Sequence, residues 1–107
     1  MSQHHLAVEI GGRAAEIMMG WDRPLQGFHC IVTVEPDDDL AYCNLDDLDL
    51  LSSFGLAQDV DHYVARLAEL GLTVPQQMLD AIRGDGLRNV GNRSVWWDAE
   101  GNQIARP

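Results

Sequence analysis

Apolar and polar residues alternate along the first third of the chain, and this alternation predicts β-strands. Residues 6–10 alternate up to a Gly-Gly pair, residues 14–21 are extended in character, and residues 28–34 are rich in β-branched and aromatic side chains. Gly-Gly is a common two-residue hairpin loop. We therefore expect a three-stranded antiparallel meander over about residues 5–35.

The two turns fix the register of this meander independently, and both select the same inward face. The loop at residues 22–27 and the Gly-Gly turn give these facing pairs: Trp21 with Phe28, Met19 with Cys30, Ile17 with Val32, Ala15 with Val34, Ile10 with Arg13, Val8 with Ala15, and Leu6 with Ile17. A slip of one residue brings Glu16 and Gly20 onto the inward face, so the apolar pattern excludes it.

The rest of the chain changes from strand to helix and back to strand. Residues 40–45 predict a short fourth strand, with Glu35 opposite Leu40 and Cys43 facing inward opposite Val32. Apolar spacing predicts a helical turn within residues 46–55, a helix over 58–70, a second helix from Pro75 that ends at Gly84-Asp85-Gly86, a strand over 94–98, and a last extended piece over 103–105.

These elements define the expected fold. We expect one α+β domain over residues 1–107, an antiparallel β-meander of three to five strands with two helices packed on one face. No apolar run approaches the roughly 20 residues of a membrane span, and the first residues lack the pattern of a signal peptide. We therefore expect a cytoplasmic location and no membrane contact.

Charge is distributed unevenly along the chain. The formal net charge is −10, all seven basic residues are arginine, and none lies between Pro24 and Ala65, where nine carboxylates are found. A surface that binds a phosphate backbone needs Lys and Arg, so this pattern opposes direct contact with nucleic acid. It is compatible with a protein partner that has a basic surface, although a solvated acidic face is the simpler interpretation.

The residues with reactive or metal-binding side chains do not form a recognisable site. Four histidines and two cysteines have no metal-ligand spacing, and His29 and Cys30 point to opposite faces of a strand. Cys30 and Cys43 lie in an acidic, apolar region, unlike an activated nucleophile, and we expect buried free thiols. We predict no catalytic residue, no metal site and no cofactor, so enzymatic activity is the less favoured interpretation.

The candidate binding residues are aromatic and acidic. Of the adjacent Trp96 and Trp97, one must face inward and the other outward, so an exposed tryptophan is an interface candidate, and which of the two is exposed stays open. The candidates are Trp21, Asp22, Arg23, Asp37, Asp38, Asp39, Asp46, Asp47, Asp49 and Trp97. For Asp22 and Arg23 the simpler role is to fix the turn, with Asp22 accepting local backbone hydrogen bonds.

One segment resembles a known pattern. Gly20-Trp21-Asp22-Arg23-Pro24-Leu25 followed by Phe28 resembles a signature that recurs in small uncharacterised bacterial proteins, and the similarity extends to residues 70–75. This resemblance implies no activity and assigns a role to no residue of the chain.

Three functional hypotheses follow. The first is a non-catalytic cytoplasmic binding or regulatory module that uses its acidic surface to engage a basic protein, with nucleic-acid mimicry as one version. The alternative is a small-ligand-binding protein or small enzyme, with a pocket between sheet and helices near His29, His62 or Cys43. A third is a homodimer joined through the outer sheet face, where Met18 and Ile31 lie.

Overall fold

Two hairpins form the centre of the sheet with the predicted registers. The computed structural model describes all 107 residues. Strands β1 (Ser2–Ile10), β2 (Arg13–Asp22) and β3 (Gly27–Val34) run antiparallel, and every facing pair predicted for them is present, from Ile10 with Arg13 to Trp21 with Phe28. The alternation of side chains therefore places the predicted apolar set on one face.

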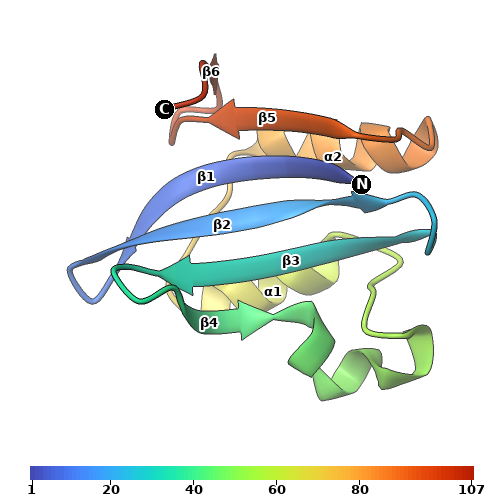
Figure 1. Cartoon of the computed structure of the whole chain (residues 1–107), viewed down its shortest axis with the longest axis horizontal. Helices are drawn as coiled ribbons and strands as arrows, with labels where there is room; N and C mark the ends of the chain where they lie inside the picture. The colour runs from blue at the N-terminus through green and yellow to red at the C-terminus, as the bar shows by residue number, and fades with distance from the viewer.

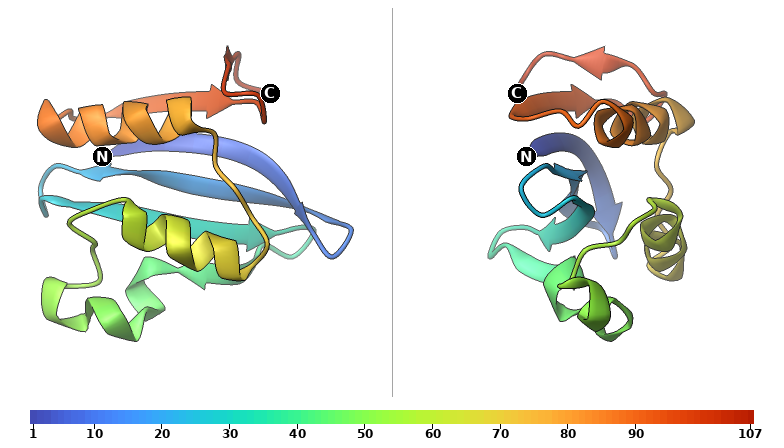
Figure 2. Two further views of the ribbon diagram at one scale, coloured as in Figure 1. Left: turned by 180° about the vertical axis from the view of Figure 1, so that it is seen from behind. Right: turned by 90° about the vertical axis from the view of Figure 1, so that its right-hand side faces the viewer.

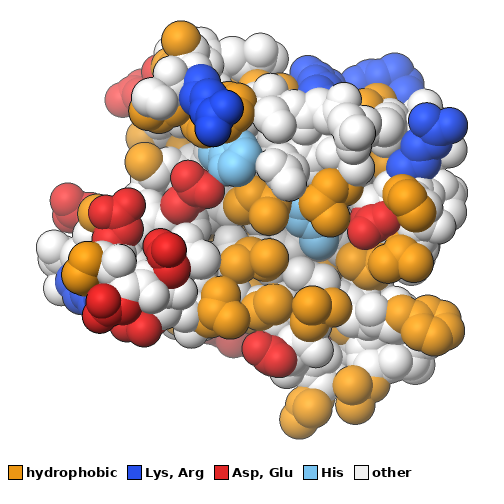
Figure 3. Space-filling model, in the orientation of Figure 1, with side chains coloured by type: hydrophobic (Ala, Val, Ile, Leu, Met, Phe, Trp, Pro, Cys, Tyr) orange, Lys and Arg blue, Asp and Glu red, His pale blue; other side chains and the backbone are white.

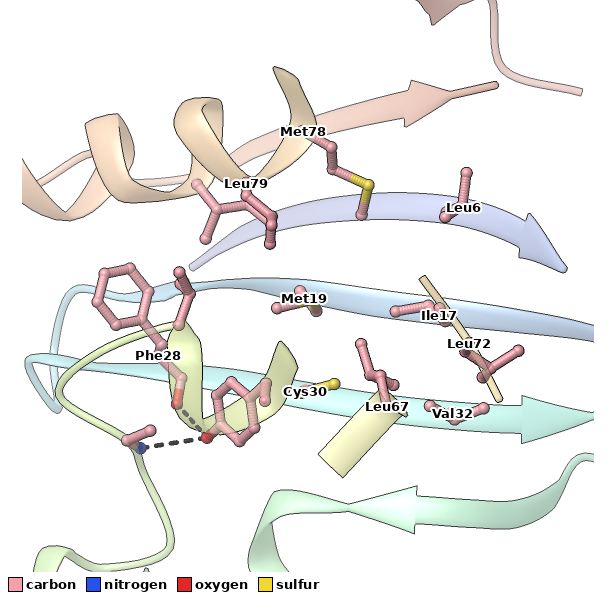
Figure 4. Close-up of a cluster of buried hydrophobic side chains, with 14 of the residues drawn as sticks. Leu6, Ile17, Met19, Phe28, Cys30, Val32, Leu67, Leu72, Met78 and Leu79 are labelled. Carbon is pink, nitrogen blue, oxygen red and sulfur yellow. Dashed lines mark hydrogen bonds between the residues drawn. The ribbon is translucent and has the colours of Figure 1, made fainter. Parts of the chain in front are cut away.

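The apolar face of the sheet packs against two helices, α1 (Asp61–Glu69) and α2 (Gln76–Leu87), as Figures 1 and 2 show. The core is one cluster of 17 buried residues, and its centre is drawn in Figure 4. The sheet contributes Ile17, Met19 and Val32, and the helices contribute Leu67 and Met78. The expected α+β arrangement, with two helices on one face, is confirmed. Neither helix has the length and apolar character needed to cross a bilayer.

The sheet has six strands in the order β4-β3-β2-β1-β5-β6, so the expectation of three to five strands was wrong. It is also mixed, because β5 (Arg93–Trp97) runs parallel to β1, with β6 (Gln103–Ile104) antiparallel beside it. The chain reaches β5 by passing over the sheet in α2, and such a crossover connection joins parallel strands. Local alternation reveals the strand but not its neighbour.

The register of β4 (Asp39–Cys43) also differs from the prediction. A bulge in the pairing with β3 places Tyr42 opposite Val32 and Cys43 opposite Ile31. The extra residue of a bulge reverses which side chains face inward, so Tyr42 packs against the core instead of Cys43. Cys30 and Cys43 are both free thiols, but only Cys30 is buried.

Two short 3₁₀-helices, η1 (Asn44–Asp46) and η2 (Leu48–Ser53), occupy the acidic leucine-rich segment. The helix α2 does not end at Gly84-Asp85-Gly86, as we expected, but continues through it. A Cβ atom on Gly86 would lie 2.7 Å from Cζ of Phe28. This glycine therefore reflects close packing of the helix on the sheet and not a stop signal.

Candidate functional site

The face of the sheet opposite the helices is here called the outer face. No helix of the chain covers it, as the edge-on view in Figure 2 shows. Figure 3 views this face and shows hydrophobic side chains in a band across its middle, acidic side chains gathered at one end, and arginines along the upper right. Apolar side chains gathered on an uncovered surface are one feature that marks interaction sites.

A hollow in this band is the candidate site, and we call it the outer-face groove. Its volume is about 250 Å³. Its apolar members come from the N-terminus, β2, β3 and the loops beside them: Met1, Met18, Leu25, Ile31, Leu45, Phe54 and Leu56. Its polar members are Asp22, His29 and Asn44. Leu25 and Leu45 at its rim are exposed.

Phe54 is the most prominent side chain at the rim. It is 87% exposed and has a φ of 59°, in the left-handed region that an aromatic residue rarely adopts. The strain is maintained because the residue ends η2, where its backbone N–H donates to the carbonyls of Leu50 and Leu51. These contacts use only the backbone of Phe54, so they give its exposed aromatic side chain no role in stabilising the fold.

The loop that carries Phe54 is anchored from below by Asn44. The buried Asn44 side chain accepts a hydrogen bond from the Cys30 amide at 3.2 Å and donates one to the Gly55 carbonyl at 2.6 Å. The Gly55 amide in turn donates to the Leu50 carbonyl at 2.8 Å. The wall of the groove is therefore tied directly to β3, which gives the site a fixed shape.

His29 forms the floor of the groove and reaches across the sheet. Its Nε2 lies 2.9 Å from the Ser2 carbonyl oxygen, and the ring passes over Gly20 to reach it. A Cβ on Gly20 would lie 1.9 Å from that oxygen, so only glycine allows this crossing. His29 is 4% exposed, and its other ring nitrogen, Nδ1, has no hydrogen-bond partner. Burial lowers the pKa of His29, more than the hydrogen bond to Ser2 raises it.

The predicted acidic residues do not form one surface. Asp37, Asp38 and Asp39 lie at the β3–β4 turn, whereas Asp22 and Arg23 lie at the opposite end of β3. The eight residues of β3 separate the two ends by about 23 Å at roughly 3.3 Å per residue. Asp37 and Asp38 are exposed and unpaired, and Arg13 lies 3.4 Å from Asp39.

Asp47 belongs to the interior of a polar network rather than to a contact surface. Its carboxylate is 5% exposed and accepts hydrogen bonds from Tyr42 at 2.6 Å, His62 at 2.8 Å and Arg66 at 3.2 Å. Burial alone raises the pKa of Asp47, but the hydrogen bonds from Tyr42, His62, the Asp49 amide and Arg66 lower it by more, well below its ordinary value. Arg66 also pairs with Asp49, so Asp46 is the exposed carboxylate of this group without a basic partner.

This network ties α1 to the 3₁₀ segment. No hydroxyl or thiol hydrogen-bonds to the His62 ring, so the His62–Asp47 pair orients a side chain without activating a nucleophile. Burial raises the pKa of the Cys30 thiol, which therefore stays protonated. No three His, Cys, Asp or Glu side chains converge as metal ligands.

The loop of Trp21, Asp22 and Arg23 is held against the segment that precedes β5. Trp21 is buried and its indole N–H donates to Asn89 Oδ1 at 3.0 Å, while Asp22 Oδ1 accepts from the Leu25 amide at 3.1 Å. The expected local hydrogen bond of Asp22 is therefore present. Arg23 is exposed beside a polar hollow of about 480 Å³. This loop supplies Asp22 and Leu25 to the outer-face groove.

Trp97 lies in the core and offers no contact surface. Its indole N–H donates to Nδ1 of the buried His4 at 3.0 Å, and Nε2 of His4 lies 2.7 Å from Asp85. Trp96 is the outward-facing member of the pair, half-buried and stacked on His5 with ring centroids 4.6 Å apart. The candidate role of Trp97 in binding is therefore withdrawn.

The pocket that we expected between sheet and helices near His29, His62 or Cys43 is not formed, because the core cluster fills that space. His29 and Cys43 lie on the outer face, away from the helices. A hollow of about 340 Å³ does lie between the end of the sheet, α2 and the segment that precedes α1, but it contains none of these three residues.

Comparison with protein-family models, with curated proteins and with solved structures gives no match for this chain. The site is therefore assigned from its geometry alone. The alternation of residues placed Met18, His29 and Ile31 on the outer face. The groove was missed because Leu25 comes from the β2–β3 loop, whereas Leu45 and Phe54 come from the connection between β4 and α1.

Proposed function

We propose that the chain is a non-catalytic, cytoplasmic protein-binding module that engages its partner through the outer face of the sheet. The observation that carries this proposal is Phe54, an exposed aromatic residue held in a strained conformation beside an apolar groove. Binding energy in protein interfaces is concentrated in a few such side chains. The partner contributes apolar side chains to the groove and basic groups to its surroundings.

The charge of the chain supports the basic character of the partner. The net charge is −10, and Asp37, Asp38 and Asp46 are exposed without a basic partner within the chain. Because the acidic groups lie at separate places around the apolar band, they favour encounter and orientation, while the groove supplies the lasting contact. Mimicry of nucleic acid is the weaker version of the proposal, since it needs carboxylates in a regular row.

The test is affinity capture from a bacterial lysate at about 50 mM and 500 mM salt, followed by titration of each purified candidate partner. We expect Phe54→Ser to weaken binding at least about 30-fold, as removal of a central anchor does. Leu51→Ser is the matched control, because Leu51 is also exposed, at 67%, on η2 but lies outside the groove. We expect Asp37→Asn with Asp38→Asn to reduce mainly the association rate and its salt dependence.

The proposal fails if no captured protein discriminates between the wild type and Phe54→Ser, or if Leu51→Ser causes the same loss. Sedimentation of the purified chain distinguishes this proposal from the remaining hypothesis, a homodimer. A homodimer joined through Met18 and Ile31 dissociates on Phe54→Ser, whereas a module for a different protein is monomeric without that protein.

A further inference from the structure

We propose that the polar hollow beside Arg23 binds a small organic acid, with the carboxylate of the ligand on the Arg23 guanidinium and on the side-chain amides of Asn89 and Asn92. We call this site the Arg23 hollow. The inference goes beyond the proposed function and does not depend on it, because Phe54 does not line this hollow. It is drawn from the charge of the lining, the hydrogen bonds that the amides already make, and the volume.

The lining of the Arg23 hollow contains no acidic residue, although the chain has 17 Asp and Glu residues. The hollow lies where the β2–β3 loop meets the connection between α2 and β5, at the upper right of Figure 1. Figure 3 shows basic side chains gathered in this region. A hollow without carboxylates in a chain of net charge −10 is suited to an anion and not to a basic group.

The Arg23 guanidinium is free to bind a ligand, because it makes no hydrogen bond or ion pair within the chain. Only one other arginine, Arg106, also lacks a carboxylate partner. The remaining five all form ion pairs: Arg13, Arg66, Arg83, Arg88 and Arg93. A Cβ atom on Gly91 would lie 3.3 Å from Nη1 of Arg23, so the guanidinium extends across the hollow to the α2–β5 connection. Its planar fork of N–H groups matches the two oxygens of a carboxylate.

The two asparagines at the hollow have their oxygens occupied and their N–H groups free. Oδ1 of Asn89 accepts the indole N–H of Trp21 at 3.0 Å and Nε2 of Gln26 at 2.7 Å. Oδ1 of Asn92 accepts from the amino group of Met1 at 2.9 Å. An indole N–H and an ammonium group can only donate, which fixes the orientation of both amides. Nδ2 of each exposed asparagine therefore remains available to an acceptor from outside the chain.

The C-terminus of α2 lies beside the hollow, where free carbonyl groups would repel an anion. Backbone amides of the following turn occupy three of these carbonyls, those of Gly84, Asp85 and Gly86. The Asp85 carboxylate lies 2.6 Å from Arg93 and 3.6 Å from Arg88, so its charge is neutralised within the chain. The full positive charge that remains for a ligand at this end of α2 is therefore that of Arg23.

The volume and the single free guanidinium favour a small organic acid over inorganic phosphate. The volume of about 480 Å³ lies within the roughly 300–1,000 Å³ of pockets for small molecules, so the ligand has a body as well as a carboxylate. One guanidinium balances the charge of one carboxylate. A phosphate dianion would keep an unbalanced charge and would be repelled more strongly by a chain of net charge −10.

The test is a titration of the full chain with acetate, lactate and inorganic phosphate at pH 7 and constant ionic strength. The ¹⁵N resonances of the arginine Nε atoms and of the asparagine side-chain amides are followed. We expect both organic acids to bind with a dissociation constant on the order of 1–30 mM, as fragments of this size do, and to shift Arg23, Asn89 and Asn92. We expect phosphate to bind at least about 3-fold more weakly than lactate.

Two variants test the assigned groups. Arg23→Gln should weaken lactate binding at least about 10-fold, the value of a hydrogen bond to a charged group, and should fold normally because the guanidinium has no partner in the chain. Asn89→Asp keeps the oxygen that accepts from Trp21 but replaces the free N–H group with a second oxygen, so it should also abolish binding. Arg106→Gln is the matched control, because Arg106 is exposed, has no carboxylate partner and lies over Trp96, outside the hollow.

The inference is overturned by the absence of a saturable shift with either acid, by shifts confined to residues outside the hollow, or by tighter binding of phosphate. Equal losses of lactate binding in Arg23→Gln and Arg106→Gln would also overturn it, since they would indicate a general effect of net charge. Phe54→Ser should bind lactate as the wild type does, so this inference and the proposed partner binding fail separately.

Discussion

Replacing Asp85 with asparagine should destabilise the fold more than any exposed substitution on the same helix. The Asp85 side chain is completely buried on α2, with Nε2 of His4 at 2.7 Å and Nη1 of Arg93 at 2.6 Å. Asparagine retains one oxygen for one of these donors and turns an N–H group toward the other. The substitution therefore removes the buried charge opposite Arg93 and places two donors against each other.

The expected loss follows from what each neighbour can recover. Removing one member of a fully buried ion pair costs about 3–5 kcal/mol. Arg93 is one-third exposed and can hydrogen-bond to water instead, so the cost here is about 1 kcal/mol lower, about 2–4 kcal/mol. With an unfolding entropy of about 2.1 cal/mol/K for each of the 107 residues, Tm should fall by about 9–18 °C.

The assay is thermal and urea unfolding followed by circular dichroism at pH 7. Asp80→Asn is the matched control, because Asp80 lies on α2 with its carboxylate 66% exposed and 3.5 Å from Arg83. That control should lose less than about 0.5 kcal/mol. A loss of that size for Asp85→Asn as well would mean that the buried network contributes nothing to stability, which would refute the reasoning.

Three further predictions concern the α2 glycines, Phe54 and the buried histidines. Gly84→Ala should stabilise the protein by about 0.5–1 kcal/mol, because only the mobile end of the Arg88 side chain lies near the new Cβ atom. Gly86→Ala should destabilise the protein, because the new Cβ atom clashes with Phe28. Unfolding titrations in which both variants change stability in the same direction would contradict this. Phe54→Gly should raise the free energy of unfolding by about 0.5–1 kcal/mol and abolish partner binding, because it relieves the positive φ and removes the anchor; a stability loss in urea unfolding would be the contrary result. Burial lowers the pKa of both His4 and His29 below 6.5, so from pH 6.5 toward 5 the unfolded chain binds protons that the folded chain does not. The free energy of unfolding should therefore decrease by up to about 2.7 kcal/mol per pH unit in that interval, and a flat profile in urea titrations would contradict this.

The central meander was predictable because two independent constraints agreed. Loop length and the alternation of apolar residues each fixed the same register, so Ile17 and Val32 face each other as expected. Neither constraint acts on β4 or β5. One extra residue in the bulge reversed Tyr42 and Cys43, and the parallel partner of β5 depends on where α2 delivers the chain.

The roles of the glycines and the residues of the site were harder to predict from the sequence, because they too depend on contacts between distant segments of the chain. Gly86 looked like a helix stop but allows Phe28 to approach, and the residue with a left-handed conformation in the β2–β3 loop is Gln26, which no glycine signal marks. The composition indicated the acidic span but not which of its carboxylates form ion pairs with arginines. One signal was present: the acidic, turn-rich segment also carries several large apolar residues, Leu45 and Phe54 among them.

The bulge in β4 also has a consequence for how molecules of this protein meet at high concentration. β4 is the outermost strand of the sheet, and none of its backbone groups hydrogen-bonds beyond the ladder with β3. This edge strand is a poor template for pairing with a strand of a neighbouring molecule, because it has only five residues, is kinked by the bulge and begins with the charged Asp39. Deletion of Ala41 would remove the bulge and straighten this edge strand. Such a variant should therefore form fibrous aggregates faster than the wild type.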